Sequence, residues 1–144
     1  MLRAFSILGL LFMIAGILAL MGLHALFSMH PAVLATQAAA VALMAWARVT
    51  FGRRSFHAAA DPTAGGIVTT GPYRYIRHPI YTSVCLFVVA GTLAHLSAAS
   101  AALCLLVVAG ALVRMVAEER LVTARYPEYA AYAAVTKRML PRVF

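Results

Sequence analysis

The chain carries very little charge. Of its 144 residues, 11% are charged and only four are acidic, whereas 64% are hydrophobic. The mean hydropathy of +0.90 lies far outside the range of water-soluble domains. These values exclude an ordinary soluble domain and predict an integral membrane protein. A membrane bundle of this length leaves no room for a second domain, so we expect one domain over residues 1–144.

Cysteine is nearly absent, with only Cys85 and Cys104 in the chain. Their positions in two apolar stretches place them at different depths, because a helix rises about 1.5 Å per residue. A disulfide requires Cα atoms within about 7 Å, so we expect two free, packed side chains. The five histidines are scattered and no Cys/His pair has ligand spacing, so no metal site is predicted.

Lysine and arginine are missing from the segments near 24–30 and near 95–97, which connect apolar stretches. All twelve cations fall on the other side of a four-helix arrangement. The positive-inside rule therefore predicts that both termini and the long middle loop are cytoplasmic. The net charge of +8 mostly reflects this orientation and contact with anionic lipid headgroups. It does not form the basic face on a soluble domain that binds nucleic acid.

The apolar stretches predict an all-α bundle of about four transmembrane helices, each long enough or nearly so to cross a core of about 30 Å. The first exceeds the apolar region of a signal peptide, and no small-residue cleavage site follows it, so we expect it to be retained. The third is the shortest and can thin the bilayer around itself. The expected helices cover about 4–27, 31–50, 79–96 and 98–118, with a cytoplasmic cofactor loop over 51–78 and a tail over 119–144.

Two smaller patterns add detail to this bundle. Gly9 and Gly16 stand seven residues apart in the first stretch, which favours close helix packing in lipid. In the tail, Tyr126-Pro127-Glu128-Tyr129 predicts the start of a short amphipathic helix at the membrane interface. We expect that helix to form a lid over a site.

The segment from Gly71 to Tyr81 concentrates turn formers, aromatic rings, arginines and a histidine in an otherwise apolar chain. Farther along, Arg114 and Glu118 stand one helical turn apart and can reach the same face. We expect these two distant clusters to make one site. Pro79 suits the first turn of a helix whose positive end lies beside His78, where an anionic group can bind.

Each of these motifs also has a purely structural interpretation. Arg114 and Glu118 are equally well explained as an i,i+4 ion pair. The run from Gly65 to Val68 either brings backbone close to a flat ligand or serves as a flexible connector. The tyrosines around His78 either form an interfacial belt or line a pocket for a cationic, aromatic cofactor. Glu119 points to a different azimuth and is expected to be solvated or to bind the tail.

The run Gly71-Pro72-Tyr73, Arg77 to Tyr81, the pair Glu118-Glu119 and the tyrosine-rich tail together resemble the isoprenylcysteine carboxyl methyltransferase family and related integral-membrane methyltransferases. The resemblance extends from Gly65 to Pro141 and implies S-adenosylmethionine as methyl donor. It assigns Arg114 to the substrate. The cofactor residues that it implies are Gly65, Gly66, Ile67, Val68, Tyr73, His78, Pro79, Ile80, Tyr81 and Glu118.

Methyl transfer from a sulfonium is an in-line displacement that requires alignment more than reactive side chains or a metal. The catalytic contribution expected of Arg114 is to orient an acceptor carboxylate bidentately. The main expectation is therefore methyl transfer to a lipophilic small molecule or lipid, with membrane lipids as the other partners. The abundance of arginine and alanine is typical of a GC-rich bacterial genome, which would place the protein in the inner membrane and disfavours a prenylated protein substrate.

Two other functions stay open. A phospholipid amine N-methyltransferase would modify a headgroup nitrogen and would need no carboxylate clamp. A non-catalytic membrane subunit or a small transporter belongs to a different class, but transporters usually show internal repeats with broken helices, and neither pattern is present.

Overall fold

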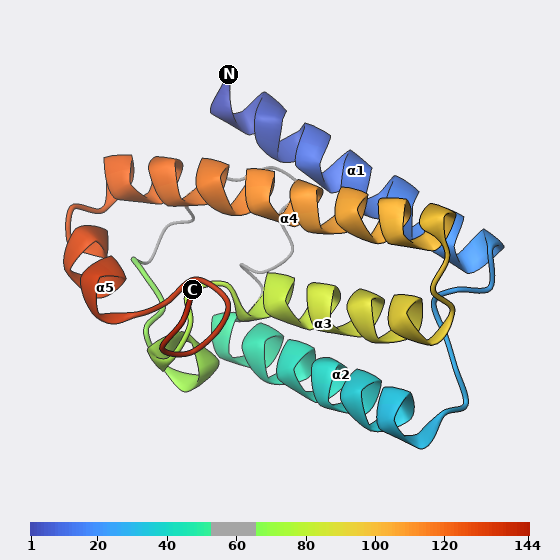
Figure 1. Cartoon of the computed structure of the whole chain (residues 1–144). Coiled ribbons are helices and arrows are strands. Elements are labelled where there is room, and N and C mark those ends of the chain that lie inside the picture. Colours follow the sequence, from blue (N-terminus) through green and yellow to red (C-terminus); the bar gives the residue numbers. More distant parts are fainter. Residues whose placement is uncertain (53–65) are drawn as a thin grey trace.

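The computed structural model describes residues 1–52 and 66–144, and these residues form an all-α fold, as predicted (Figure 1). In the described part, β character is limited to an isolated parallel bridge between Ile76 and Lys137. The α-helices are α1 (Leu2–Gly22), α2 (Pro31–Phe51), α3 (Pro79–Ala94), α4 (Ala98–Arg125) and α5 (Tyr129–Val135), and the 3-10 helix is η2 (Gly71–Arg74).

Three described helices, α1, α2 and α4, are long and apolar enough to cross a membrane. The fourth expected span, α3, is apolar but has only 16 residues. The prediction that this helix is the shortest is confirmed. Its length corresponds to about 24 Å, so it crosses a full hydrocarbon core only where the bilayer is thinned.

Two predicted helix ends were wrong. The first helix ends at Gly22 rather than near residue 27, because His24 adopts a left-handed φ of 53°. The backbone N–H groups of His24 and Ala25 then bond to the carbonyls of Met21 and Leu20, which is a Schellman ending. The signal was weak because histidine occupies the position that glycine usually takes.

The fourth helix continues to Arg125 instead of ending near residue 118. The polar residues after Ala117 are good helix formers, so the end of the apolar run does not end the helix. Pro127 fixes the end, because it disfavours helical backbone at the residue before it, and Tyr126 is extended.

The long helices form two packed pairs, α1 with α4 and α2 with α3, and α3 also contacts α4 (Figure 1). Glycines allow the first pair to approach closely, as predicted for Gly9 and Gly16. A Cβ added at Gly9 would lie 2.6 Å from the carbonyl oxygen of Gly110, and one at Gly16 would lie 2.6 Å from Val107. Small residues at such a crossing maximise backbone contact, which drives helix association in lipid.

A buried glutamine joins the second pair to the connection that follows α1. The Gln37 side chain in α2 donates to the carbonyl oxygens of Leu26, at 2.8 Å, and Phe87, at 3.3 Å. These bonds satisfy a polar group that would be costly to bury alone. Cys85 and Cys104 are both free and buried, as predicted.

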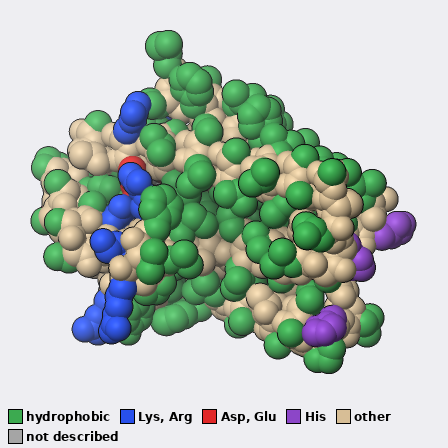
Figure 2. Space-filling model, viewed as in Figure 1, with side chains coloured by type: hydrophobic (Ala, Val, Ile, Leu, Met, Phe, Trp, Pro, Cys, Tyr) green, Lys and Arg blue, Asp and Glu red, His purple; other side chains and the backbone are tan. Residues whose placement is uncertain are grey.

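The surface of the bundle is segregated along its length. Large hydrophobic side chains such as Leu93 and Leu105 are exposed along the helices. In the view of Figure 2, lysine and arginine gather at one end and histidine at the other, with hydrophobic side chains between them. The arginine-rich end is where α1 begins, α2 ends, α3 begins and α4 ends (Figure 1), and we call it the polar end.

The contact between α1 and α4 generates a stability prediction. We expect Gly110→Ala to lower the thermal unfolding temperature in detergent micelles, because its Cβ would lie 2.5 Å from the Gly9 carbonyl oxygen. Overpacking of this kind costs about 1 to 3 kcal/mol. Gly22→Ala is the control, since nothing lies within 4 Å of a Cβ there. Equal unfolding temperatures for the two variants would show that the glycine contact is not tight.

Candidate functional site

The two polar clusters predicted from the sequence meet at the polar end. The Tyr81 hydroxyl in α3 donates to the Glu118 carboxylate in α4 and accepts a hydrogen bond of 2.7 Å from Arg114 Nε. One residue along α4, Glu119 bonds to Arg77 and His78 at the start of α3. We call Arg77, His78, Tyr81, Arg114, Glu118 and Glu119 the polar cluster.

Arg114 is 5% exposed and faces groups from three helices. Besides Tyr81 in α3, its guanidinium donates to the Ser6 carbonyl oxygen in α1, at 3.2 Å, and to Glu118 Oε1, at 3.4 Å. The i,i+4 ion pair with Glu118 is confirmed. The guanidinium thus holds the tyrosine and the carboxylate in fixed positions next to α1.

Glu119 is the most extensively paired carboxylate of the cluster. Its Oε1 accepts from Arg77 Nε at 3.0 Å and lies 3.2 Å from His78 Nε2. Its Oε2 accepts from Arg138 Nε and Nη2 at 3.0 and 2.9 Å. Of the two expected roles of Glu119, solvation or binding of the tail, the second is confirmed, and the side chain is only 14% exposed.

The sequence analysis did not include Glu119 among the site residues, although a signal was present. The chain has four carboxylate side chains and twelve lysine and arginine side chains, so few anionic acceptors are available for its cations. An arginine that becomes buried needs an anionic or carbonyl acceptor. Arg77 lies next to a proline-started apolar helix, so a carboxylate from another segment was a natural acceptor, and the Glu118-Glu119 pair offered two faces of one helix.

Residues 136–140, which we call the C-terminal strap, are bonded to the entrance of α3. The backbone N–H groups of Arg77 and His78 donate to the carbonyl oxygens of Lys137, at 2.7 Å, and Arg138, at 2.9 Å. Thr82 Oγ1 donates to the Met139 carbonyl oxygen at 3.1 Å. The Arg77 guanidinium also donates to the carbonyl oxygens of Ala133 and Thr136.

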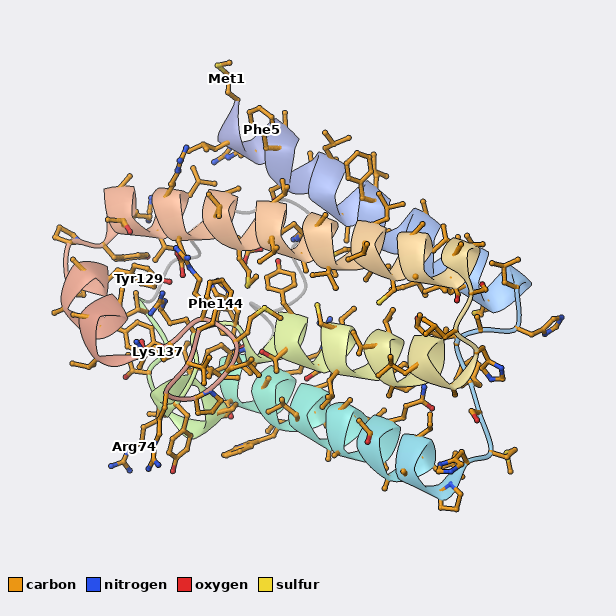
Figure 3. All side chains as sticks on the ribbon, in the orientation of Figure 1. Met1, Phe5, Arg74, Tyr129, Lys137 and Phe144 are labelled. Atoms are coloured by element: carbon orange, nitrogen blue, oxygen red, sulfur yellow. The ribbon has the colours of Figure 1, made fainter. Side chains whose placement is uncertain are left out.

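The tail contains the short helix that was predicted, α5, and Tyr132 fixes it to η2. The Tyr132 hydroxyl donates to the Tyr73 carbonyl oxygen at 2.6 Å. Burial raises the pKa of Tyr132 to about 12 and raises those of Tyr73 and Tyr129 as well. The phenols therefore stay protonated at neutral pH. In Figure 3, Tyr129 and Lys137 lie at the polar end and Arg74 points away from the bundle.

The remaining residues assigned to the cofactor precede or begin α3. Gly66, with φ of 78°, Ile67 and Val68 are half-buried and lead into η2. Pro79 occupies the first turn of α3, as predicted, and is followed by half-buried Ile80. Gly65 lies outside the described residues. Within 1–52 and 66–144, no three His, Cys, Asp or Glu side chains form a group that could hold a metal ion.

Comparison with known proteins gives two matches. The model of the phospholipid methyltransferase family matches residues 47–129, which include all of η2, α3 and α4. The cobalt-zinc-cadmium resistance protein CzcN of Cupriavidus metallidurans is 34% identical over 78 residues, 54% of this chain and 36% of that protein. The matched region thus spans just over a third of the length of that relative. No solved structure matches the chain.

The pairing of Glu119 generates a second prediction. Glu119→Gln removes the negative charge that faces Arg77, His78 and Arg138 and replaces one acceptor oxygen by a donor amide, and leaving a buried donor without its acceptor costs about 1 to 3 kcal/mol. We expect faster hydrogen exchange at the amides of Arg77 and His78, which bond to the strap. Glu128→Gln is the matched control, because Glu128 is exposed and makes no side-chain cap for α5. Unchanged exchange in Glu119→Gln would show that the strap is held without the carboxylate.

Proposed function

The chain belongs to the phospholipid methyltransferase family, and on this premise we propose that it transfers a methyl group from S-adenosylmethionine to the amine headgroup of a membrane lipid. The observation that carries the proposal is the placement of Glu118. Its side chain is 26% exposed at an end of the molecule dominated by arginine, and Tyr81 and Arg114 hold its carboxylate. A fixed, partly exposed carboxylate suits a cationic ligand group.

The residues present fit S-adenosylmethionine by their chemistry. The positively charged part of the cofactor is complementary to the Glu118 carboxylate. The cofactor's own carboxylate is complementary to the positive end of the α3 dipole, which starts at Pro79 beside His78. When bound, this cofactor supplies a methyl group on a positively charged sulfur. We propose that the cofactor is held by Gly65, Gly66, Ile67, Val68, Tyr73, His78, Pro79, Ile80, Tyr81 and Glu118.

The chain itself contributes alignment and shielding from water. Tyr81 accepts from Arg114 and donates to Glu118, so the carboxylate has a defined position and is not free to rotate. The strap and α5 cover the entrance of α3 through the bonds of Arg77 and Tyr132. Alignment of two reactants in such a site can lower a barrier by about 7 to 11 kcal/mol. The attacking amine must be neutral: its lone pair would form the bond to the methyl carbon as the carbon–sulfur bond breaks, which leaves a neutral thioether, and the methylated ammonium then loses a proton to water.

An amine acceptor agrees better with the site than the carboxylate acceptor that we first expected. The family match supports the phospholipid amine alternative. In addition, the Arg114 guanidinium already donates to Tyr81, Ser6 and Glu118, and binding a substrate carboxylate would require some of these bonds to break. We therefore propose that Arg114 positions Tyr81 and Glu118. A carboxylate acceptor oriented by Arg114 is the second candidate.

We also propose that the polar end is cytoplasmic. Arginine and lysine gather there and α1, α2 and α4 are apolar enough to span the bilayer. The methyl donor is a polar, water-soluble molecule, and this orientation gives it direct access to the polar cluster.

The reaction can be tested with purified protein in vesicles of phosphatidylethanolamine and a long-chain fatty acid, with S-adenosylmethionine labelled on the methyl group. We expect label in the lipid extract that base does not release as volatile methanol, because N-methyl groups are stable whereas methyl esters release methanol. Label that base releases as methanol would support the carboxylate acceptor and contradict the amine. Absence of both cofactor binding and label transfer would contradict the proposed function as a whole.

Cofactor binding should depend on Glu118. Glu118→Gln is expected to weaken S-adenosylmethionine binding about tenfold to a hundredfold, because a lost charge-assisted bond costs about 1.5 to 3 kcal/mol. Calorimetric titration measures this change, with Glu128→Gln as the control of equal charge change. If Glu118→Gln binds the cofactor as tightly as the control, the assignment of Glu118 is wrong.

Arg114→Lys distinguishes a positioning role of Arg114 from direct contact with the substrate, because it keeps the positive charge and loses the planar guanidinium. A lysine cannot reach Tyr81, Ser6 and Glu118 at once. We therefore expect cofactor affinity and turnover to fall together, by about tenfold or more. If turnover falls while cofactor affinity stays unchanged, Arg114 acts directly on the substrate, as the resemblance to carboxyl methyltransferases implies.

A further inference from the structure

A cavity of about 220 Å³ lies away from the polar cluster, between α1, α2 and α3. Its wall includes Leu26 from the connection after α1 and small Ala40 from α2. The other principal lining residues are Ile17, Val41, Met44, Val84, Phe87 and Val88. We call this cavity the apolar groove.

The groove begins within one helical turn of the polar cluster. Val84 and Val88 stand three and seven residues after Tyr81, so the three side chains share one stripe of α3. At about 1.5 Å per residue, the lining residues of α3, from Ser83 to Val88, extend from roughly 3 to 10 Å beyond Tyr81. Leu26, from the segment after α1, lies at the end of the groove away from the polar end.

The wall offers nothing that binds a polar group. Its one hydroxyl belongs to Ser83, and this hydroxyl donates to the Pro79 carbonyl oxygen at 2.8 Å. The other lining side chains are apolar, so a headgroup or a water molecule placed there would lose its hydrogen bonds. Val41, at the rim, is 57% exposed on a helix long and apolar enough to span the bilayer. The groove is therefore accessible from the hydrocarbon core.

From these features we propose that the apolar groove binds a hydrocarbon chain of the acceptor lipid. This inference rests on the proposed function, because it needs an acceptor whose headgroup reaches the polar cluster. A lipid chain runs from the interface toward the bilayer centre, and the groove runs in the same direction from Tyr81. A chain in the groove holds the headgroup beside Glu118, so the groove raises the affinity for long-chain acceptors without taking part in the reaction.

Val41→Phe tests the groove by placing a bulky ring at its rim. We expect this variant to raise the KM for long-chain phosphatidylethanolamine about tenfold, the effect of a changed fit in an apolar pocket. For dibutanoyl phosphatidylethanolamine, whose chains are too short to fill the groove, kcat/KM is expected to stay within about twofold of wild type. The affinity for S-adenosylmethionine should be unchanged.

Ala42→Phe is the matched control, because Ala42 neighbours Val41 on α2, is exposed and does not line the groove. Ala42→Phe should behave as wild type toward both acceptors. An equal effect of Val41→Phe on long and short acceptors, or no effect on either, would overturn the proposal.

A binding measurement separates this inference from the proposed reaction. Phosphatidylethanolamine with a diazirine in its acyl chain should cross-link to peptides containing Val41 or Val84 in the wild type and much less in Val41→Phe. Unlabelled phosphatidylethanolamine should compete, whereas phosphatidylglycerol of equal chain length should not. Competition by both lipids would show that the groove takes bulk lipid and would overturn the assignment to the acceptor. If no lipid is methylated, the proposed reaction is wrong, and the cross-links still show whether the groove binds the lipid chain.

Discussion

Buried arginines that must find acceptors in a chain with few carboxylates dominate the polar end. Glu118 and Glu119 are adjacent on α4 but point to different sides, so one carboxylate joins Tyr81 and Arg114 while the other joins Arg77, His78 and Arg138. A low local dielectric makes each such pair strong and makes each unpaired charge costly. The two carboxylates therefore link α4 to the entrance of α3 and to the tail, in addition to the backbone bonds between the strap and α3.

The sequence predicts the number and class of helices well because hydropathy reports burial in lipid directly. The shortness of α3, the glycine contacts of α1 and the free cysteines follow from the same local reasoning. Helix ends are less well predicted, because they depend on backbone geometry that composition does not encode. His24 in a left-handed conformation ends α1, and the helix formers after Ala117 extend α4 beyond its apolar run.

The parts of the candidate site that consist of short sequence motifs could be predicted from the sequence. The convergence of Tyr81 with Arg114 and Glu118 was predicted, since both segments lie at the same end of the bundle. The strap was missed in detail because backbone bonds between residues 76–78 and 137–138 leave no mark in side-chain chemistry. The hydrogen bonds of Gln37 were missed for a related reason. The sequence does not indicate which backbone carbonyl groups a single polar residue in an apolar helix will bond to.

The bond between the strap and the entrance of α3 joins segments that are far apart in the chain. Residues 136–140 are synthesised after all four long helices, so the backbone partners of Arg77 and His78 are among the last parts of the polar end to be made. The polar end therefore cannot be completed while the helices are being synthesised, and it closes only when the tail folds back onto α3.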